Sequence, residues 1–299
     1  MENFHQLNYF RFVAQTENIS EAARKLHISQ PSLSQSVKRL EEEIGHTLFE
    51  RIGRHIVLND NGRILLDAVE RMDRIYQGAL REITEKSEHA QKEVSVYIGC
   101  ASLHLPQLLE YLKRKTPDIK YHIFQWRENG MEENDIGVVA LEGRAEEHFD
   151  AGNPVFGGLR YEVLFEEEIV LALPLHHPLA GKESLTPADL QGENLICLNE
   201  SWELGKSIQK IIAGLKEKPE VSVWVDNPNL MRELLGKGLG MAFVPSISWK
   251  GFAEDAVVTK KVSGLDVRRT VCVCYGEEKY ITTAERECIN GIREYFFLI

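Results

Sequence analysis

The sequence predicts an α/β protein in three successive parts: a winged helix-turn-helix over residues 1–58, one long helix over 59–91, and a larger domain of alternating strands and helices over 92–299. Short amphipathic segments joined by cap residues predict the first part. A single apolar stripe with helical spacing predicts the second part. Apolar runs of strand length that alternate with helical patterns predict the third.

The composition is that of an ordinary globular protein and excludes several classes. The 299 residues are 43% hydrophobic and 27% charged, which argues against disorder, and no apolar run approaches the ~20 residues of a membrane helix. The start of the chain lacks the basic and then apolar layout of a secretory signal. The five cysteines are an odd number without C-x-x-C pairs, which favours a reducing cytoplasm over a disulfide framework. We therefore expect a cytoplasmic protein.

Charge is distributed unevenly along the chain. Over the whole sequence 35 Lys and Arg stand against 46 Asp and Glu, a net charge of −11. Residues 1–58 carry seven of each sign and are neutral, whereas residues 92–299 carry 23 basic and 32 acidic residues, a net charge of −9. A neutral segment ahead of an acidic body is compatible with an end that faces nucleic acid. Because the acidic body repels phosphate, such a surface must be local and compact.

The first part begins with three helices. An apolar stripe over residues 5–15 predicts the first helix, and Ser20 is the expected N-cap of the second. The third helix starts at Ser29-Gln30-Pro31, because proline is tolerated in a first turn where its missing N–H is not needed. Two brief helices around a short turn, braced by an earlier helix, form a helix-turn-helix.

The third helix has one buried and one exposed face. Its apolar stripe follows spacings of 4, 3 and 4 and consists of Leu33, Val37, Leu40 and Ile44. The other side carries Gln35, Lys38 and Arg39, flanked by Ser32 and Ser34. Small hydroxyls let a helix lie deep in a major groove, an amide can bond base edges, and the two cations can reach bases or phosphates.

A short hairpin follows this helix. Residues 48–58 alternate between apolar and polar side chains, and Arg51 and Arg54 flank Gly53 at the expected tip. This pattern predicts a basic wing beside the helix-turn-helix.

Residues 5–66 resemble the LysR-type transcriptional regulators. The resemblance is carried by Leu7-x-x-Phe10, Ser20-Glu21-Ala22-Ala23-x-x-Leu26, Ser29-Gln30-Pro31-Ser32-Leu33-Ser34, Leu40-Glu41-x-x-Ile44-Gly45 and Leu48-Phe49-Glu50-Arg51. It implies that bases are read by Gln30, Pro31, Ser34 and Gln35, and that Arg54 is the wing arginine. Many members of the family have Arg where this chain has Gln35, so the half-site sequence does not carry over from relatives.

The whole set of residues expected at the DNA consists of Ser20, Ser29, Gln30, Pro31, Ser32, Ser34, Gln35, Lys38, Arg39, Arg51 and Arg54. The alternative interpretation is a helical bundle whose polar face meets only solvent.

Residues 60–91 are expected to form one long helix, capped by Asn59 or Asp60. Apolar side chains recur along it at spacings of 4, 4, 3, 4 and 4, at Ile64, Ala68, Met72, Ile75, Ala79 and Ile83. A stripe surrounded by charges predicts pairing with a partner helix, and the resemblance likewise implies a linker helix that pairs two protomers. The alternative is a helix packed on the body of its own chain.

The expected partners follow from this pairing. A two-fold pair presents two recognition helices, so we expect a homodimer through residues 60–91 on imperfect palindromic promoter DNA. The resemblance further implies a homotetramer, a small-molecule effector, and RNA polymerase as an additional partner.

From residue 93 onward strands and helices alternate. Strands are expected over residues 94–98, 119–126, 136–141, 168–173, 194–198, 221–225, 240–244 and 269–275, and helices from 102 to 112, around 204–216 and 229–237, and over 282–297. The resemblance implies two lobes, residues 92–164 with 267–299 and residues 165–266, joined by two crossing strands as in periplasmic solute-binding proteins.

A cleft between such lobes is the natural ligand site, since ligands of α/β folds bind at strand ends near helix N-termini. Ser102 lies at a helix start and offers a hydroxyl and N–H groups to a carboxylate. The other positions that the resemblance places in the effector pocket are Gln125, Arg127, Asn199, Ser201 and Phe243. Each has a structural alternative: the two serines as helix caps, for example, and Arg127 as a surface cation.

The chain departs from the family between Trp126 and Ile136, where relatives commonly carry a further helix and this sequence has only nine residues. We expect the first lobe to be trimmed there and its cleft to be wider or more open.

No enzyme signature is convincing. The stretch Gly236-Lys-Gly-Leu-Gly240 follows a helix and precedes a strand, the reverse of a nucleotide-binding loop, so a helix cap and turn are expected. His176-His177 lacks supporting metal ligands. Cys272 and Cys274 share one face of a strand and are expected in the core. We expect neither catalysis nor a metal or cofactor. The remaining alternative is a solute-binding or thiol-based redox-sensing α/β module with a helical oligomerisation front end.

Overall fold

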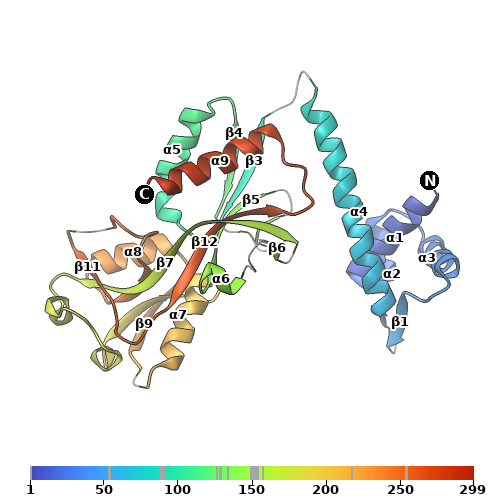
Figure 1. The fold of residues 1–299 in the computed structure, drawn as a ribbon. Helices are drawn as coiled ribbons and strands as arrows, with labels where there is room; N and C mark the ends of the chain where they lie inside the picture. The colour runs from blue at the N-terminus through green and yellow to red at the C-terminus, as the bar shows by residue number, and fades with distance from the viewer. Residues whose placement is uncertain are drawn as a thin grey trace. The chain divides into compact units, whose positions relative to one another are not determined.

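The computed structural model describes residues 2–52, 55–87, 92–125, 127, 130–132, 135–148, 155–156, 158–216, 218–252 and 255–299. The chain forms two compact units, Met1–Ala90 with Glu278–Tyr280, and Gln91–Glu277 with Ile281–Ile299. Helices and strands of both units are labelled in Figure 1.

The first unit is a three-helix bundle with a two-stranded hairpin and one long helix. Its elements are α1 (Glu2–Thr16), α2 (Ile19–Lys25), α3 (Gln30–Ile44), β1 (Phe49–Ile52), β2 (His55–Leu58) and α4 (Asp60–Glu85). β1 and β2 pair antiparallel. Phe10 and Leu33 are fully buried at the centre of the bundle, as the apolar stripes predicted.

Cap residues set the helix boundaries in this unit. The N-cap of α2 is Asn18, whose side chain accepts from the N–H groups of Ser20 and Glu21, so the prediction of Ser20 as N-cap was wrong. Ser29 caps α3, and Gly45 ends that helix in the left-handed conformation at φ 78°. Ile44 was expected in the buried stripe but is 40% exposed, because it lies in the last turn beyond the bundle.

The turn between α3 and the hairpin is held by a carboxylate. Glu41 Oε1 accepts from the N–H of Leu48 at 2.7 Å and more weakly from that of Phe49 at 3.4 Å. Asn59 then caps α4 by accepting from Gly62 N–H at 2.9 Å. A Cβ at Gly62 would lie 2.2 Å from the carbonyl oxygen of Leu48, so the start of α4 approaches the hairpin too closely for any other residue.

The second unit alternates strands and helices. Its elements are β3 (Glu93–Ile98), η1 (Ser102–His104), α5 (Leu105–Lys115), β4 (Lys120–Phe124), β5 (Ile136–Glu142), α6 (Ala145–His148), β6 (Val155–Phe156), β7 (Leu159–Pro174), η2 (Pro178–Gly181), η3 (Pro187–Leu190), β8 (Asn194–Leu198), α7 (Glu203–Gly214), β9 (Glu220–Val225), α8 (Pro228–Gly236), β10 (Ala242–Pro245), β11 (Val257–Lys260), β12 (Arg268–Gly276) and α9 (Thr283–Phe297). The main sheet has the order β10-β7-β12-β5-β3-β4, and β8 pairs with β9 in a separate parallel pair.

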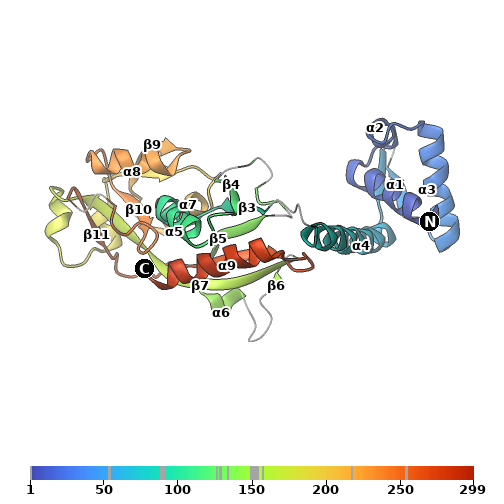
Figure 2. The same cartoon turned by 90° about the horizontal axis from the view of Figure 1, so that it is seen from above.

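Two separate apolar cores divide this unit into two lobes. The first lobe packs α5 and α9 on β3, β5 and β12, and Figure 2 shows the two helices side by side. The second lobe packs α7 and α8 on β8, β10 and the later part of β7. The mixed α/β fold with two lobes is thus the predicted one.

β7 belongs to both lobes. Its residues 159–168 pair with β12, and residues 169–174 pair with β10 and β11. The sequence predicted a strand over 168–173 only, so the first nine residues of this strand were missed.

Candidate functional site

The exposed face of α3 carries a compact polar surface. Gln30, Pro31, Ser32, Ser34, Gln35, Lys38 and Arg39 are all exposed, whereas Leu33, Val37 and Leu40 on the opposite side are buried. The structure therefore brings these predicted residues together on one face. Arg51 on β1 is also exposed, and Arg54 lies outside the described residues.

Local hydrogen bonds order the first turn of this surface. Ser29 Oγ lies 2.7 Å from Ser32 Oγ, and Ser20 Oγ donates to Gln30 Oε1 at 3.2 Å. Ser20 and Ser29 are exposed, and these bonds link α2 to the start of α3. The side-chain amide of Gln30 therefore has a hydrogen-bond partner on α2.

The two cations of α3 differ in their surroundings. Lys38 Nζ lies 3.5 Å from Glu42 Oε1 across one helical turn, an exposed pair of the kind worth at most about 1 kcal/mol. Arg39 has no ion-pair partner among the described residues. Both side chains can therefore exchange their present surroundings for phosphate at little cost.

α4 exposes apolar side chains along its length. Ile64 is 72% exposed, Ile75 61% and Ile83 66%, and Met72 is 43% exposed. The opposite side packs on the bundle through Val69, which is 6% exposed. An apolar stripe of this length left uncovered on a helix is typical of a helix–helix interface.

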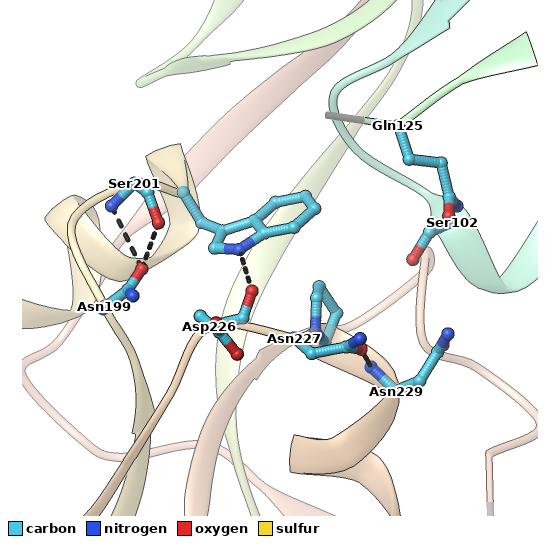
Figure 3. A pocket seen from close by; sticks show the side chains of 9 residues that line it. Ser102, Gln125, Asn199, Ser201, Asp226, Asn227 and Asn229 are labelled. Atoms are coloured by element: carbon cyan, nitrogen blue, oxygen red, sulfur yellow. Dashed lines mark hydrogen bonds between the residues drawn. The ribbon is translucent and has the colours of Figure 1, made fainter. Parts of the chain in front are cut away.

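A cavity of about 480 Å³ opens between the two lobes of the second unit. From the first lobe it is lined by Ser102 and Gln125, and from the second by Asn199, Ser201, Trp202, Asp226, Asn227, Pro228 and Asn229. Figure 3 shows Asn199 and Ser201 at one end and Ser102 and Asn229 at the other. Four of the six residues expected at an effector pocket thus line this one cavity.

Two parallel strands, β8 and β9, position the residues that line the cavity from the second lobe. β8 and β9 end at the same edge, so the residues after Leu198 and Val225 meet there. Asn199 Oδ1 accepts from the N–H of Ser201 at 3.2 Å and from its hydroxyl, and Trp202 Nε1 donates to the carbonyl of Asp226 at 2.7 Å.

The residues from Asp226 to Asn229 and Trp202 were missed at the sequence level. The segment 226–229 follows a predicted strand in the same way that Asn199 does, and this position was the available signal. Asn227 caps α8 by accepting from the N–H groups of Asn229 and Leu230, at 2.8 and 3.4 Å.

Arg127 and Phe243 do not line the cavity. Arg127 Nη1 pairs with the buried carboxylate of Asp135 at 2.5 Å, and its guanidinium lies 3.3 Å from the ring centroid of Phe124. Phe243 is 2% exposed and belongs to the core of the second lobe, because β10 pairs with β7 at that point.

A buried ionic group lies where β7 passes from one lobe to the other. Glu167 is 2% exposed and its Oε1 accepts from Arg269 Nε at 2.7 Å and from Ser248 Oγ at 2.6 Å. Its Oε2 accepts from the backbone N–H groups of Ile247 and Ser248, at 3.0 and 2.7 Å. These partners come from β12 and from the segment that follows β10.

The five cysteines are buried and free. Burial raises the pKa of Cys100, Cys197, Cys272 and Cys274 to about 12. A thiol with a raised pKa and no access to solvent is a poor nucleophile, so these four positions do not have the surroundings of a redox sensor.

In the described part of the chain no three potential metal ligands lie close enough to hold an ion.

A winged helix-turn-helix joined to a two-lobed domain with a cavity between the lobes defines a ligand-responsive, DNA-binding transcriptional regulator. Two family models match the sequence: "Bacterial regulatory helix-turn-helix protein, lysR family" over residues 4–63, and "LysR substrate binding domain" over residues 91–297. The chain belongs to the LysR family of transcriptional regulators.

Curated relatives agree over nearly the whole chain. An uncharacterised HTH-type transcriptional regulator of Bacillus subtilis, YybE, is 26% identical over 292 residues, 93% of this chain and 94% of the relative. The regulator AlsR of the same organism is 29% identical over 92% of this chain and 90% of its own length. These relatives are transcriptional regulators and not enzymes.

Solved structures share the fold. A full-length OxyR variant from Pseudomonas aeruginosa matches with a TM-score of 0.57 and 22% identity, over 97% of this chain and 94% of that chain. CbnR, a LysR family regulator, matches with a TM-score of 0.51 and 21% identity, over 97% of this chain and 99% of that chain.

None of the helices in the described residues is long and apolar enough to cross a membrane.

Proposed function

We propose that this regulator binds imperfect palindromic promoter sites as a homodimer paired through residues 60–91, and that two dimers associate into a tetramer. The observation that carries the proposal is the exposed polar face of α3, opposite a fully buried stripe in the same helix. A helix with this division can pack on its own domain and still present Gln35, Lys38 and Arg39 to a groove.

The three parts of the chain then have separate roles. Residues 1–58 contact DNA through the set predicted above, from Ser20 to Arg54. Residues 59–91 pair the protomers through the apolar stripe of α4, and residues 92–299 respond to an effector in the cavity. The protein would act in the cytoplasm, where promoter DNA lies, and RNA polymerase is a further partner in the proposal.

Effector control would follow from the two lobes. A ligand that contacts Ser102 on one lobe and Asn199 on the other binds one relative lobe position better than another, and so shifts the population. The change of lobe angle would alter the geometry between dimers, and with it the spacing or bend imposed on DNA.

A salt titration tests the DNA-binding role. The affinity of the wild type for promoter DNA should fall steeply between about 50 and 200 mM salt, because several phosphate contacts per protomer release counterions. The double variant Lys38→Gln, Arg39→Gln should bind more weakly and show a smaller salt slope, by about one unit for each lost phosphate contact.

The matched control is Lys216→Gln, Lys218→Gln, which removes two exposed cations from the second lobe. This control should bind like the wild type. A flat salt response of the wild type, with equal affinity for unrelated duplexes, would instead favour the solute-binding module with an oligomerisation front end.

A further inference from the structure

Gln35 lies at the centre of the exposed face of α3. It follows Leu33 by two residues and precedes Val37 by two, and both of these apolar side chains are buried. At about 100° of rotation per residue, a side chain at this position projects almost directly away from the buried stripe. Gln35 is exposed, so its amide faces the base edges when the first two turns of α3 lie in a major groove.

Two other polar side chains in these turns already have hydrogen-bond partners. Gln30 Oε1 accepts from Ser20 Oγ at 3.2 Å, and Ser32 Oγ lies 2.7 Å from Ser29 Oγ. In the part of the chain that the structure describes, no hydrogen bond occupies the amide of Gln35. Its carbonyl oxygen and its NH2 group are therefore both available to a base.

The charged side chains of α3 lie to the sides of this amide or beyond it. Lys38 and Arg39 follow about one turn later, about 60° to one side of Gln35 and about 40° to the other. Cations in this arrangement reach the phosphates on both sides of a groove. Glu42 follows after two turns on nearly the same line as Gln35, and its exposed carboxylate repels phosphate, which confines the inserted part to the first half of the helix.

An amide with a free acceptor and a free donor matches one base in the major groove. Adenine presents N7 as an acceptor beside its N6 amino group, a donor, whereas guanine presents two acceptors, N7 and O6. The NH2 group of a glutamine can donate to adenine N7 while its carbonyl oxygen accepts from adenine N6. Against guanine the same carbonyl oxygen would face O6, another acceptor, with no proton between them.

We infer that Gln35 specifies an A·T base pair in each half-site, by donating to adenine N7 and accepting from adenine N6. This inference rests on the proposed function, in which two protomers pair on an imperfect palindrome. Two-fold symmetry then places the A·T pair at the same position of both half-sites. Replacing it in one half-site should weaken binding by about tenfold, the expected cost of one lost bidentate contact.

The first test is the selection of binding sites from a library of randomised duplexes by the full-length wild type and by Gln35→Arg. The arginine fork suits the two acceptors of guanine, so the variant should select G·C at one position of each half-site where the wild type selects A·T. The other positions should stay unchanged. Each protein should prefer its own site by about tenfold, and Gln35→Ala should lose the preference at this position alone.

Gln15→Arg is the matched control, because Gln15 is exposed on α1 and the substitution adds the same charge. This control should select the wild-type site. Identical sites for the wild type and Gln35→Arg overturn the inference, and so does a wild-type preference other than A·T at the position that changes. A wild type that selects no palindromic site overturns the proposed function itself, an outcome distinct from a palindrome whose base preferences do not depend on Gln35.

A modified base tests the contact without any change to the protein. In 7-deazaadenine a carbon replaces N7, while the pairing with thymine is kept. At the adenine assigned to Gln35, this replacement should weaken binding of the wild type by about fivefold, as expected for one lost hydrogen bond, and should leave binding of Gln35→Ala unchanged. An equal loss in both proteins, or none in the wild type, contradicts the inference.

Discussion

Glu167 and Arg269 show how much a single buried carboxylate can organise. The carboxylate of Glu167 binds a guanidinium, a hydroxyl and two backbone N–H groups, and its side chain is fully buried. Removing one partner of such a pair leaves a buried charge without compensation, whereas exposed pairs contribute little. The neighbouring pair of Arg268 and Glu168 is more exposed and provides the comparison.

Arg269→Met should therefore lower the free energy of unfolding by about 3–5 kcal/mol. Arg268→Met should lower it much less, because an exposed ion pair contributes little. Urea denaturation followed by circular dichroism measures both. Equal losses in the two variants would show that Glu167 does not depend on its cation.

The buried thiols lead to a second prediction at this scale. With a pKa of about 12, only about one Cys272 side chain in 10⁵ is a thiolate at pH 7. Iodoacetamide should therefore label the native protein far more slowly than the urea-unfolded protein, and the rate should rise about tenfold per pH unit as long as the fold persists. Replacing all five cysteines by serine should leave the response of promoter binding to peroxide unchanged. A loss of such a response in that variant would restore the redox-sensing alternative.

Two features of single residues could not be predicted from the sequence, namely the N-cap of α2 and the burial of Arg232. Asn18 and Ser20 are both good cap residues two positions apart, and only the backbone conformation decides between them: Asn18 is extended, at φ −146°. The burial of Arg232 was not predicted, because an arginine on a short amphipathic helix is usually a surface cation. The residues that it contacts, Ser102 and Trp249, lie on other elements.

At the scale of elements, α4 is the one whose sequence and structure agree most directly. Helical spacing predicted its stripe, and the structure leaves Ile64, Ile75 and Ile83 more than half exposed. A helix of 26 residues is far longer than the bundle requires, so most of its apolar stripe stays exposed. Beyond the bundle, Gly78 lies against Tyr280 and Arg74 pairs with Glu278. The end of the predicted helix, beyond Ser87, lies outside the described residues.

Met72→Lys together with Ile75→Asp should yield monomers that no longer bind promoter DNA tightly, because both substitutions place charges in the proposed seam. The control Asp67→Lys, Arg71→Asp reverses an exposed ion pair on the flank of the same helix and also leaves the net charge unchanged. Analytical ultracentrifugation and promoter binding compare the two. Undiminished promoter affinity of the first variant means that the protomers pair elsewhere.

Strands were predicted well where they are buried on both faces. The strand over 194–198 was found with its observed bounds, and residues 195–198 are all buried. The early part of β7 was missed because Glu162, Glu166 and Glu167 interrupt its apolar residues, and the ionic partners that make this tolerable come from β12 and the segment after β10. The short β6 and β11 carried too little pattern to be recognised.

At the scale of the whole molecule, the chain consists of parts with separate cores. The bundle and the two lobes each bury their own apolar residues, and the two units share no core cluster among the described residues. The order of the parts and four cavity residues could be predicted from the sequence with the family resemblance. The cavity itself could not, since it depends on how two lobes built from discontinuous segments face each other.

A fragment of residues 91–299 should therefore fold alone and unfold in a single cooperative transition. It should not bind promoter DNA, because its net charge is strongly negative and it lacks α3. Calorimetry and a DNA-binding titration check both expectations. A fragment that aggregates or unfolds without cooperativity would show that the second unit depends on the first.

β7 is a single continuous strand of 16 residues, about 50 Å long, that serves as a structural member of both lobes. A ligand that draws the lobes together cannot rotate one of them about a free joint, because the same backbone is hydrogen-bonded into each. The motion must be taken up as torsion along this strand. The resistance of this strand to twisting would therefore oppose any change in the angle between the lobes.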